Sequence, residues 1–246
     1  MIPLRDDIRS QTTPVINVTL IALNVLAFLY QLMLGPELNQ FLREFAVIPA
    51  LYYHSAMVTV GGGLREVTPV DLTVPLFTSM FLHGGFMHLG GNMLYLWIFG
   101  DNVEDRMGHG RYLVFYLLCG VAASAGHIWS SPASRVPSLG ASGAIAGVLG
   151  AYLLLYPKAR VVTLLPLGFF TQVIQVPALF FLGFWFLQNF LYGLFSLNVQ
   201  SAQSGGVAWW AHSGGFVAGV ALVWVFKKPA YRPRERDTWW QERQRR

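Results

Sequence analysis

Charged residues divide this chain into long apolar intervals. No Asp, Glu, Lys or Arg occurs in five stretches, which run over residues 10–36, 72–100, 112–134, 136–157 and 161–226. A helix needs about 20 apolar residues to cross the hydrocarbon core of a bilayer. Each of the first four stretches has room for one such helix, and the fifth has room for two, separated by the polar segment 198–206. The pattern therefore predicts an all-α polytopic membrane protein with six transmembrane helices.

The ends of the predicted spans follow from charges, glycines and prolines. The six spans are expected over residues 15–34, 76–100, 112–130, 142–156, 174–197 and 207–226. The first is expected to be retained, because Gly35-Pro36-Glu37 lacks the small-x-small pattern of a signal-peptide cleavage site. The predicted organisation is thus an N-terminal tail (1–14), a six-helix membrane domain (15–226) and a basic C-terminal tail (227–246).

The distribution of Lys and Arg predicts the orientation. Only 12% of the 246 residues are charged, against about 25% in soluble domains. Cytoplasmic segments of membrane proteins are rich in Lys and Arg. If the N-terminus is cytoplasmic, the opposite side carries only Arg43, Arg65 and Arg135. Both termini are therefore predicted to be cytoplasmic, in a plasma membrane of the bacterial inner-membrane type. The basic tail predicts affinity for anionic lipids, and nothing else supports nucleic-acid binding.

A serine between glycines begins the fourth predicted helix, at Gly140-Ala141-Ser142-Gly143. About 15 residues, or roughly 22 Å of helix, separate Ser142 from the stop at Pro157, while the hydrocarbon core is about 30 Å thick. Ser142 should therefore lie inside the membrane, where irregular backbone is tolerated only when it is buried or lines a watery cavity. The alternative is helix packing, since Gly143 and Gly147 form a small-xxx-small face.

The last predicted span carries a histidine beside a second glycine face. His212 is followed by Gly215 and Gly219, which match Gly143 and Gly147 on the fourth helix. Packing of the two faces would bring His212 to Ser142 as a general base to a nucleophile. A buried histidine bonded to a carbonyl is the alternative. Because the spans contain no acidic residue, the arrangement would have to be a dyad.

The second predicted span adds polar side chains one helical turn apart. His88 and Asn92 share a helix face, and both can donate hydrogen bonds to a tetrahedral oxyanion together with the backbone N–H of Ser142. His83 is expected to be structural. A metal site is the competing interpretation, but the chain lacks the His-Glu-x-x-His pattern of membrane metalloproteases. No metal and no cofactor are therefore expected.

These features together resemble the rhomboid family of intramembrane serine proteases. The motifs that carry the resemblance are His83-x4-His88-x3-Asn92, Gly140-Ala141-Ser142-Gly143 and Ala211-His212-x-Gly214-Gly215-x3-Gly219. The resemblance implies a serine endopeptidase that cleaves transmembrane segments of other proteins. It assigns Ser142 as nucleophile, His212 as base, and His88, Asn92 and the Ser142 amide as the oxyanion hole. Structural support is expected from His83, Gly140, Gly143, Gly215 and Gly219.

Two features of the sequence depart from the family pattern, and two other functions are alternatives to proteolysis. Some members carry an aromatic residue four positions after the serine, but here that position is Ala146, so another group must hold the His212 ring. The Trp-Arg pair of many members is not evident in residues 35–74. The rival function is that of a non-catalytic rhomboid-like protein that binds membrane clients. A transporter is disfavoured, because the spans lack carboxylates for ion coupling.

Two further expectations concern local structure. The loop 100–108 is predicted to have a structural role, in which Glu104 and Arg106 pair or cap helix ends. The fifth span is crowded with Phe and Trp, a composition that suits a helix facing lipid.

Overall fold

The computed structural model describes residues 1–53, 57–60, 63–167, 170–197 and 208–229. Most of these residues are helical. The helices are α1 (Val15–Met33), α2 (Leu38–Phe45), α3 (Pro69–Thr78), α4 (Phe86–Met107), α5 (His109–Ser130), α6 (Ser142–Leu155), α7 (Ala178–Leu197) and α8 (Trp209–Phe226). The strands are β1 (Ile2–Asp6), β2 (Met57–Val60), β3 (Gly63–Glu66), β4 (Arg160–Leu167) and β5 (Phe170–Pro177). Short 3-10 turns, including Ser79–Phe81, join some of them.

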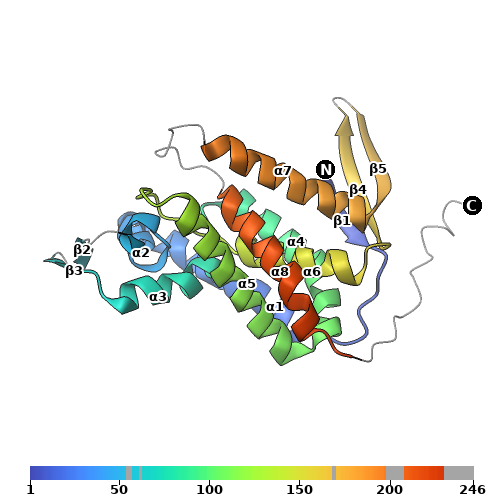
Figure 1. Ribbon diagram of the computed structural model, residues 1–246, viewed down its shortest axis with the longest axis horizontal. Helices are drawn as coiled ribbons and strands as arrows, with labels where there is room; N and C mark the ends of the chain where they lie inside the picture. The colour runs from blue at the N-terminus through green and yellow to red at the C-terminus, as the bar shows by residue number, and fades with distance from the viewer. Residues whose placement is uncertain (54–56, 61–62, 168–169, 198–207, 230–246) are drawn as a thin grey trace, which may run out of the picture.

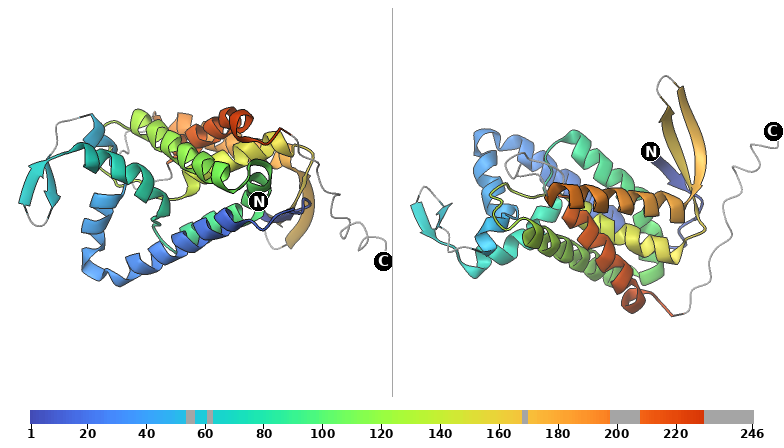
Figure 2. Two further views of the ribbon diagram at one scale, coloured as in Figure 1. Left: turned by 90° about the horizontal axis from the view of Figure 1, so that it is seen from below. Right: turned by 45° about the horizontal axis from the view of Figure 1, so that its top comes forward.

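Helix α6 is the centre of the bundle. Its residues from Gly143 to Tyr152 are all buried, because α4, α5 and α8 pack around it. Figure 1 shows α7 along one side of this core, with α2, α3 and the β2–β3 hairpin at one end and β1, β4 and β5 at the other. The two further views in Figure 2 show the same separation of the ends.

Four helices are long and apolar enough to cross a membrane: Val15–Met33, His109–Ser130, Ala178–Ser196 and Trp209–Phe226. Helix α6 is apolar but shorter, with 14 residues. Helix α4 has 22 residues but is more polar, since it carries His88, Asn92 and a charged C-terminal end. The protein is thus a polytopic helical membrane protein by length and composition, and the count of six crossings stays a prediction.

The expectation of an all-α chain was wrong. Strands β1, β4 and β5 form an antiparallel sheet in that order, with Ile2 opposite Leu164 and Leu164 opposite Val173. The run of β-branched residues at the start of β4 favours a strand, and pairing with β1 satisfies backbone groups on one edge. Consequently α7 begins at Ala178 rather than at residue 174, and residues 2–6 of the predicted tail belong to the sheet.

The predicted second span is also not one continuous helix. Helix α3 ends at Thr78 and α4 begins at Phe86, so the segment with His83 and the Gly84-Gly85 pair lies between two helices. Glycine disfavours helix by about 1 kcal/mol relative to alanine. At its other end α4 continues to Met107, through most of the residues predicted as a loop.

The charged end of α4 caps the first helix. Both carboxylate oxygens of Glu104 accept backbone N–H bonds at the start of α1, from Ile16 at 3.0 Å and from Asn17 at 2.7 Å. An anion at a helix N-terminus is stabilised by unpaired N–H groups and by the helix dipole. The predicted capping role of Glu104 is therefore confirmed.

The N-terminal strand and the chain just after α8 approach each other at this end of α4. Arg106 donates to the carbonyl of Lys228 at 3.0 Å, and the Lys228 N–H donates to the Arg106 carbonyl at 2.9 Å. The N-terminal strand reaches the same place, since Asn102 donates to the Asp6 carboxylate at 2.9 Å. The predicted polar break 198–206 and residues 230–246 of the basic tail lie outside the described residues.

Asp6 is a partly buried acidic residue outside the membrane-spanning helices. Besides Asn102, the hydroxyl of Tyr152 donates to its carboxylate. Burial, helped by the neighbouring carboxylates of Asp101 and Asp7, raises the pKa of Asp6 from 3.8 to about 8 and outweighs the opposing effect of the Tyr152 bond.

Thermal unfolding should therefore depend on pH through Asp6. Because the pKa is raised in the folded state, the stabilising contribution is full below the unfolded value of 3.8 and is lost as pH rises through about 8. Asp6→Asn keeps an oxygen for Asn102 and Tyr152 but cannot ionise. In detergent micelles, its unfolding temperature should fall less between about pH 5 and about pH 9 than that of the wild type. An equal fall in both proteins would contradict this assignment.

Candidate active site

Glycine faces bring α6 and α8 into backbone contact. A Cβ added at Gly215 would lie 2.0 Å from the Gly143 carbonyl oxygen, and one at Gly219 would lie 2.0 Å from the Gly147 carbonyl oxygen. No larger residue fits there without moving a backbone. This close approach sets the distance between Ser142, the first residue of α6, and His212, in the first turn of α8.

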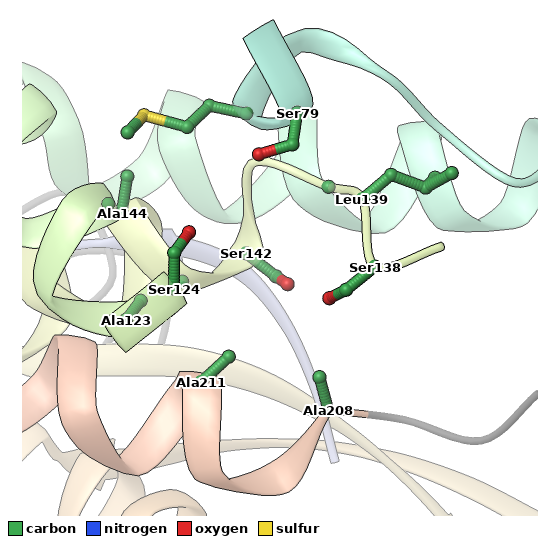
Figure 3. Close-up of a pocket in the computed structure, with 13 residues that line it drawn as sticks. Ser79, Ala123, Ser124, Ser138, Leu139, Ser142, Ala144, Ala208 and Ala211 are labelled. Carbon is green, nitrogen blue, oxygen red and sulfur yellow. The ribbon is translucent and has the colours of Figure 1, made fainter. Parts of the chain in front are cut away.

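Ser142 and His212 are in hydrogen-bond contact. The distance between Ser142 Oγ and His212 Nε2 is 2.8 Å, although the two residues are 70 positions apart in the chain. Both side chains are partly exposed. Figure 3 shows Ser142 between the loop that carries Ser138 and the start of α8, with Ala208 just before that helix and Ala211 on it. The serine hydroxyl therefore opens into a pocket and has a potential base beside it.

The backbone before Ser142 requires glycine. Gly140 has φ +132°, a conformation that other residues rarely adopt, and its N–H donates to the Ser79 carbonyl at 2.9 Å. A Cβ at this position would lie 2.8 Å from Cε1 and Nε2 of His88. Gly140 thus lets the His88 ring approach the start of α6.

The hydrogen bond to His88 indicates which ring nitrogen carries the proton. The Gly84 N–H donates to Nδ1 of His88 at 3.3 Å, so Nδ1 accepts and a neutral ring carries its proton on Nε2. Nε2 is the nitrogen that faces Gly140, two residues before Ser142. His88 is therefore a hydrogen-bond donor whose Nε2 lies beside Gly140, close to the start of α6.

Asn92 is held by a chain of polar contacts that begins on α1. Its Nδ2 lies 2.9 Å from Nε2 of His83. The side-chain amide of Gln31 makes two hydrogen bonds to the His83 backbone. Its Nε2 donates to the carbonyl at 3.0 Å, and its Oε1 accepts from the N–H at 2.9 Å. Gln31 was not foreseen as part of the site. A glutamine within an apolar span was the available signal.

His212 has two neighbours on α7. Its Nδ1 lies 2.7 Å from Oδ1 of Asn189, and its ring centroid lies 5.8 Å from that of Trp185, with the planes tilted by 36°. Neither residue was singled out from the sequence, because the aromatic composition of this span indicated a lipid-facing helix. Asn189, a polar side chain in an apolar helix, was the signal that could have identified the contact.

Comparison with known proteins decides the family. The Rhomboid domain model matches residues 72–229, which is more than half of the chain and includes all the site residues except Gln31. The chain belongs to the rhomboid family. Within this rhomboid's described residues, no three His, Cys, Asp or Glu side chains gather in a way that could hold a metal ion.

Several curated rhomboid proteins are similar to this one. Rhomboid protein 1, mitochondrial, of Saccharomyces cerevisiae is 30% identical over 224 residues, which cover 88% of this chain and 55% of the yeast protein. Rhomboid protease GluP of Bacillus subtilis is 36% identical over 148 residues, which cover 60% of this chain and 25% of GluP. Rhomboid-like protein 11, chloroplastic, of Arabidopsis thaliana is 32% identical over 155 residues, covering 61% of this chain and 51% of that protein. This rhomboid thus spans about half, or less, of the length of these relatives.

The structure also shows what contacts the histidine in this rhomboid in place of an aromatic at Ala146. Trp185 lies on the His212 ring and is itself 6.3 Å from the Phe216 ring, between centroids. Trp209 on α8 lies edge-on to the same ring at 6.4 Å between centroids, so the aromatic neighbours of the histidine come from α7 and α8 rather than from α6, the helix of the serine.

Proposed function

We propose that this rhomboid is an intramembrane serine endopeptidase that cleaves transmembrane segments of other membrane proteins through a Ser142–His212 dyad. The observation that carries the proposal is the 2.8 Å contact between Ser142 Oγ and His212 Nε2. A hydroxyl and a histidine at this distance are the pairing that activates a serine nucleophile. The similar protein GluP is a rhomboid protease by name, which supports the same reaction class.

The first half of the reaction forms an acyl-enzyme. Ser142 Oγ attacks the carbonyl carbon of the scissile peptide bond while its proton passes to His212 Nε2. The carbonyl oxygen becomes an oxyanion in the tetrahedral intermediate. When this intermediate collapses, the C–N bond breaks, and His212 returns the proton to the leaving amine.

The second half hydrolyses the ester. His212 Nε2 takes a proton from a water molecule, whose oxygen attacks the ester carbonyl carbon. The ester bond to Ser142 Oγ then breaks, and the serine recovers its proton from His212. The products are a new carboxylic acid and the free hydroxyl of Ser142, so no cofactor or metal is needed.

Three donors are available for the oxyanion. The Ser142 N–H lies at the start of α6, where backbone N–H groups have no partner within the helix. His88 carries its proton on Nε2, and Asn92 has two amide N–H groups, of which His83 engages one. Preorganised donors of this kind stabilise charge that develops in the transition state.

The proposal includes six membrane crossings, with α4 and α6 added to the four long apolar helices. The N-terminal strand and Lys228 lie together at the end of α4, which supports their lying on the same side of the membrane. The distribution of Lys and Arg assigns that side to the cytoplasm. Ser142 begins α6, whereas β4, the partner of β1, follows the other end of that helix. The site would then open to the side opposite the termini.

The relatives do not identify the membrane in which this rhomboid lies, so the membrane stays a prediction. Their names place one in mitochondria and one in chloroplasts, and a third comes from a bacterium. They therefore do not support the expected bacterial plasma membrane over an organelle membrane. Lipids and transmembrane protein substrates are the proposed partners.

Cleavage in liposomes tests the function. The purified protein is reconstituted with a panel of single-span membrane proteins tagged at both ends, and fragments are followed on gels. Wild type should produce fragments and Ser142→Ala should not. If the wild type and Ser142→Ala both bind intact tagged proteins and neither produces fragments, the non-catalytic client-binding function would be favoured instead.

The same assay measures how much each proposed oxyanion donor contributes to kcat. Loss of one such donor costs about 10²- to 10³-fold in kcat in serine proteases, so His88→Ala and Asn92→Ala should each lower kcat by about 10²-fold. Gly90→Ala is the matched control on α4, since its Cβ would meet nothing within 4 Å. Unchanged kcat in both donor variants would remove them from the oxyanion hole.

A further inference from the structure

Asn189 is a buried polar residue on α7 with no role in the dyad mechanism above. Its side chain is only 5% exposed, although most of this helix is apolar and several of its Phe and Leu residues are exposed. Polar groups inside a bilayer are costly and tend to be functional. The question is what the Asn189 amide does between α7 and α8.

Hydrogen bonds at both ends fix the orientation of the amide. Nδ2 of Asn189 donates to the Trp185 carbonyl at 2.7 Å, one turn earlier on the same helix. An amide N–H₂ can only donate and an amide oxygen can only accept. The flipped amide would place two acceptors, the Asn189 and Trp185 oxygens, against each other. Oδ1 is therefore the atom that faces His212 Nδ1 at 2.7 Å.

This orientation selects one tautomer of the histidine. Because Oδ1 only accepts, Nδ1 of His212 must carry a proton to complete the bond. In a neutral imidazole, Nε2 then has a free lone pair, which is the form that can accept the Ser142 proton across 2.8 Å. The opposite tautomer would present an N–H to Ser142 and could not act as its base.

We propose that Asn189 is a positioning residue that completes a Ser142–His212–Asn189 arrangement. This inference rests on the proposed function, since it concerns the base of that same site. Asn189 holds the proton on Nδ1 and, with the Trp185 ring, fixes the plane of the imidazole. A neutral amide does this without burying a carboxylate in the membrane, where a charge is expensive.

Kinetics of covalent inactivation and of cleavage test the proposal. Asn189→Leu has a similar size but cannot accept a hydrogen bond. Replacing the triad aspartate of a serine protease, which leaves the wrong tautomer, costs about 10⁴-fold in kcat. Because the partner here is neutral, Asn189→Leu should lower kcat and the rate of fluorophosphonate labelling by about 10²-fold, with KM nearly unchanged. Asn189→Asp can accept from His212 Nδ1 and, when protonated, can also donate to the Trp185 carbonyl, so it should recover part of the rate.

The control separates an effect on His212 from damage to the helix. Gln188→Leu removes a neighbouring amide that is exposed on α7, and it should retain the wild-type rate. Labelling of Asn189→Leu at the wild-type rate would overturn the inference and leave the proposed dyad intact. Failure of the wild type to label would instead count against the proposed function.

A spectroscopic measurement on the wild type determines the tautomer of His212 directly, so it does not depend on whether Asn189→Leu is stable. Nitrogen-15 NMR of imidazole-labelled wild-type protein, with His212→Gln used to assign the signal, reports which ring nitrogen is protonated. A proton on Nδ1 of His212 supports the proposal. A proton on Nε2 overturns it, even where Asn189→Leu does not fold.

Discussion

Ser142→Ala is expected to abolish covalent labelling of the purified protein by a fluorophosphonate probe, and His212→Ala should do the same. The probe reacts with a serine oxygen that has been activated by a base, and Ser142 has His212 Nε2 at 2.8 Å. In a well-characterised serine protease, loss of either the serine or the histidine lowers kcat by on the order of 10⁶-fold. Labelling is followed by gel fluorescence in detergent, where the variants should show only background.

Ser124→Ala is the matched control for this experiment. Ser124 lines the same pocket as Ser142, but His212 Nε2 is bonded to Ser142, so this variant should label like the wild type. Labelling that survives Ser142→Ala would show that another hydroxyl reacts with the probe. Labelling that survives His212→Ala would show that Ser142 is activated by a different group.

The sequence predicted several helix boundaries closely because charges, glycine and proline mark them directly. The first span begins at Val15, the third ends at Ser130, the fourth begins at Ser142 and the last ends at Phe226, as expected. Each boundary lies beside a charge, a proline or a glycine-rich turn. Such signals are local, so one sequence is enough to interpret them.

The sheet was missed because absence of charge does not distinguish helix from strand. Residues 161–177 are uncharged, and they were taken as loop and helix within one apolar run. The β-branched Val161, Val162 and Thr163 favour strand. Their pairing with residues 2–6 joins segments more than 150 positions apart, a contact that no local pattern records.

The contacts around His212 needed the tertiary structure for a similar reason. The glycine faces indicated that α6 and α8 approach each other, since small residues at matching spacing let membrane helices pack closely. Asn189 and Trp185 lie on α7, and nothing in their spacing indicates which helix they face. Their role became visible only when the structure placed α7 beside α8.

Gly219→Leu is expected to cause a large loss of stability. Its Cβ would lie 2.0 Å from the Gly147 carbonyl oxygen and 2.6 Å from the carbonyl carbon and Cα of Gly147. All three are backbone atoms of α6, so no side-chain rotation relieves the clash and the helices must separate. Overpacking of a core costs typically about 1–3 kcal/mol, and a backbone clash belongs at or above the upper end of that range.

Separation of these helices should also disrupt the contact between Ser142 and His212. Gly219 lies on the α8 face that sets the position of His212 relative to Ser142, so a shift lengthens the 2.8 Å bond between them. Unfolding in detergent should occur at a markedly lower temperature, and the fraction that remains folded should label slowly with the fluorophosphonate. Gly183→Ala is the control, because its Cβ would meet nothing within 4 Å. Equal unfolding temperatures and labelling rates for Gly219→Leu and the wild type would mean that the α6–α8 backbone contact does not hold the site together.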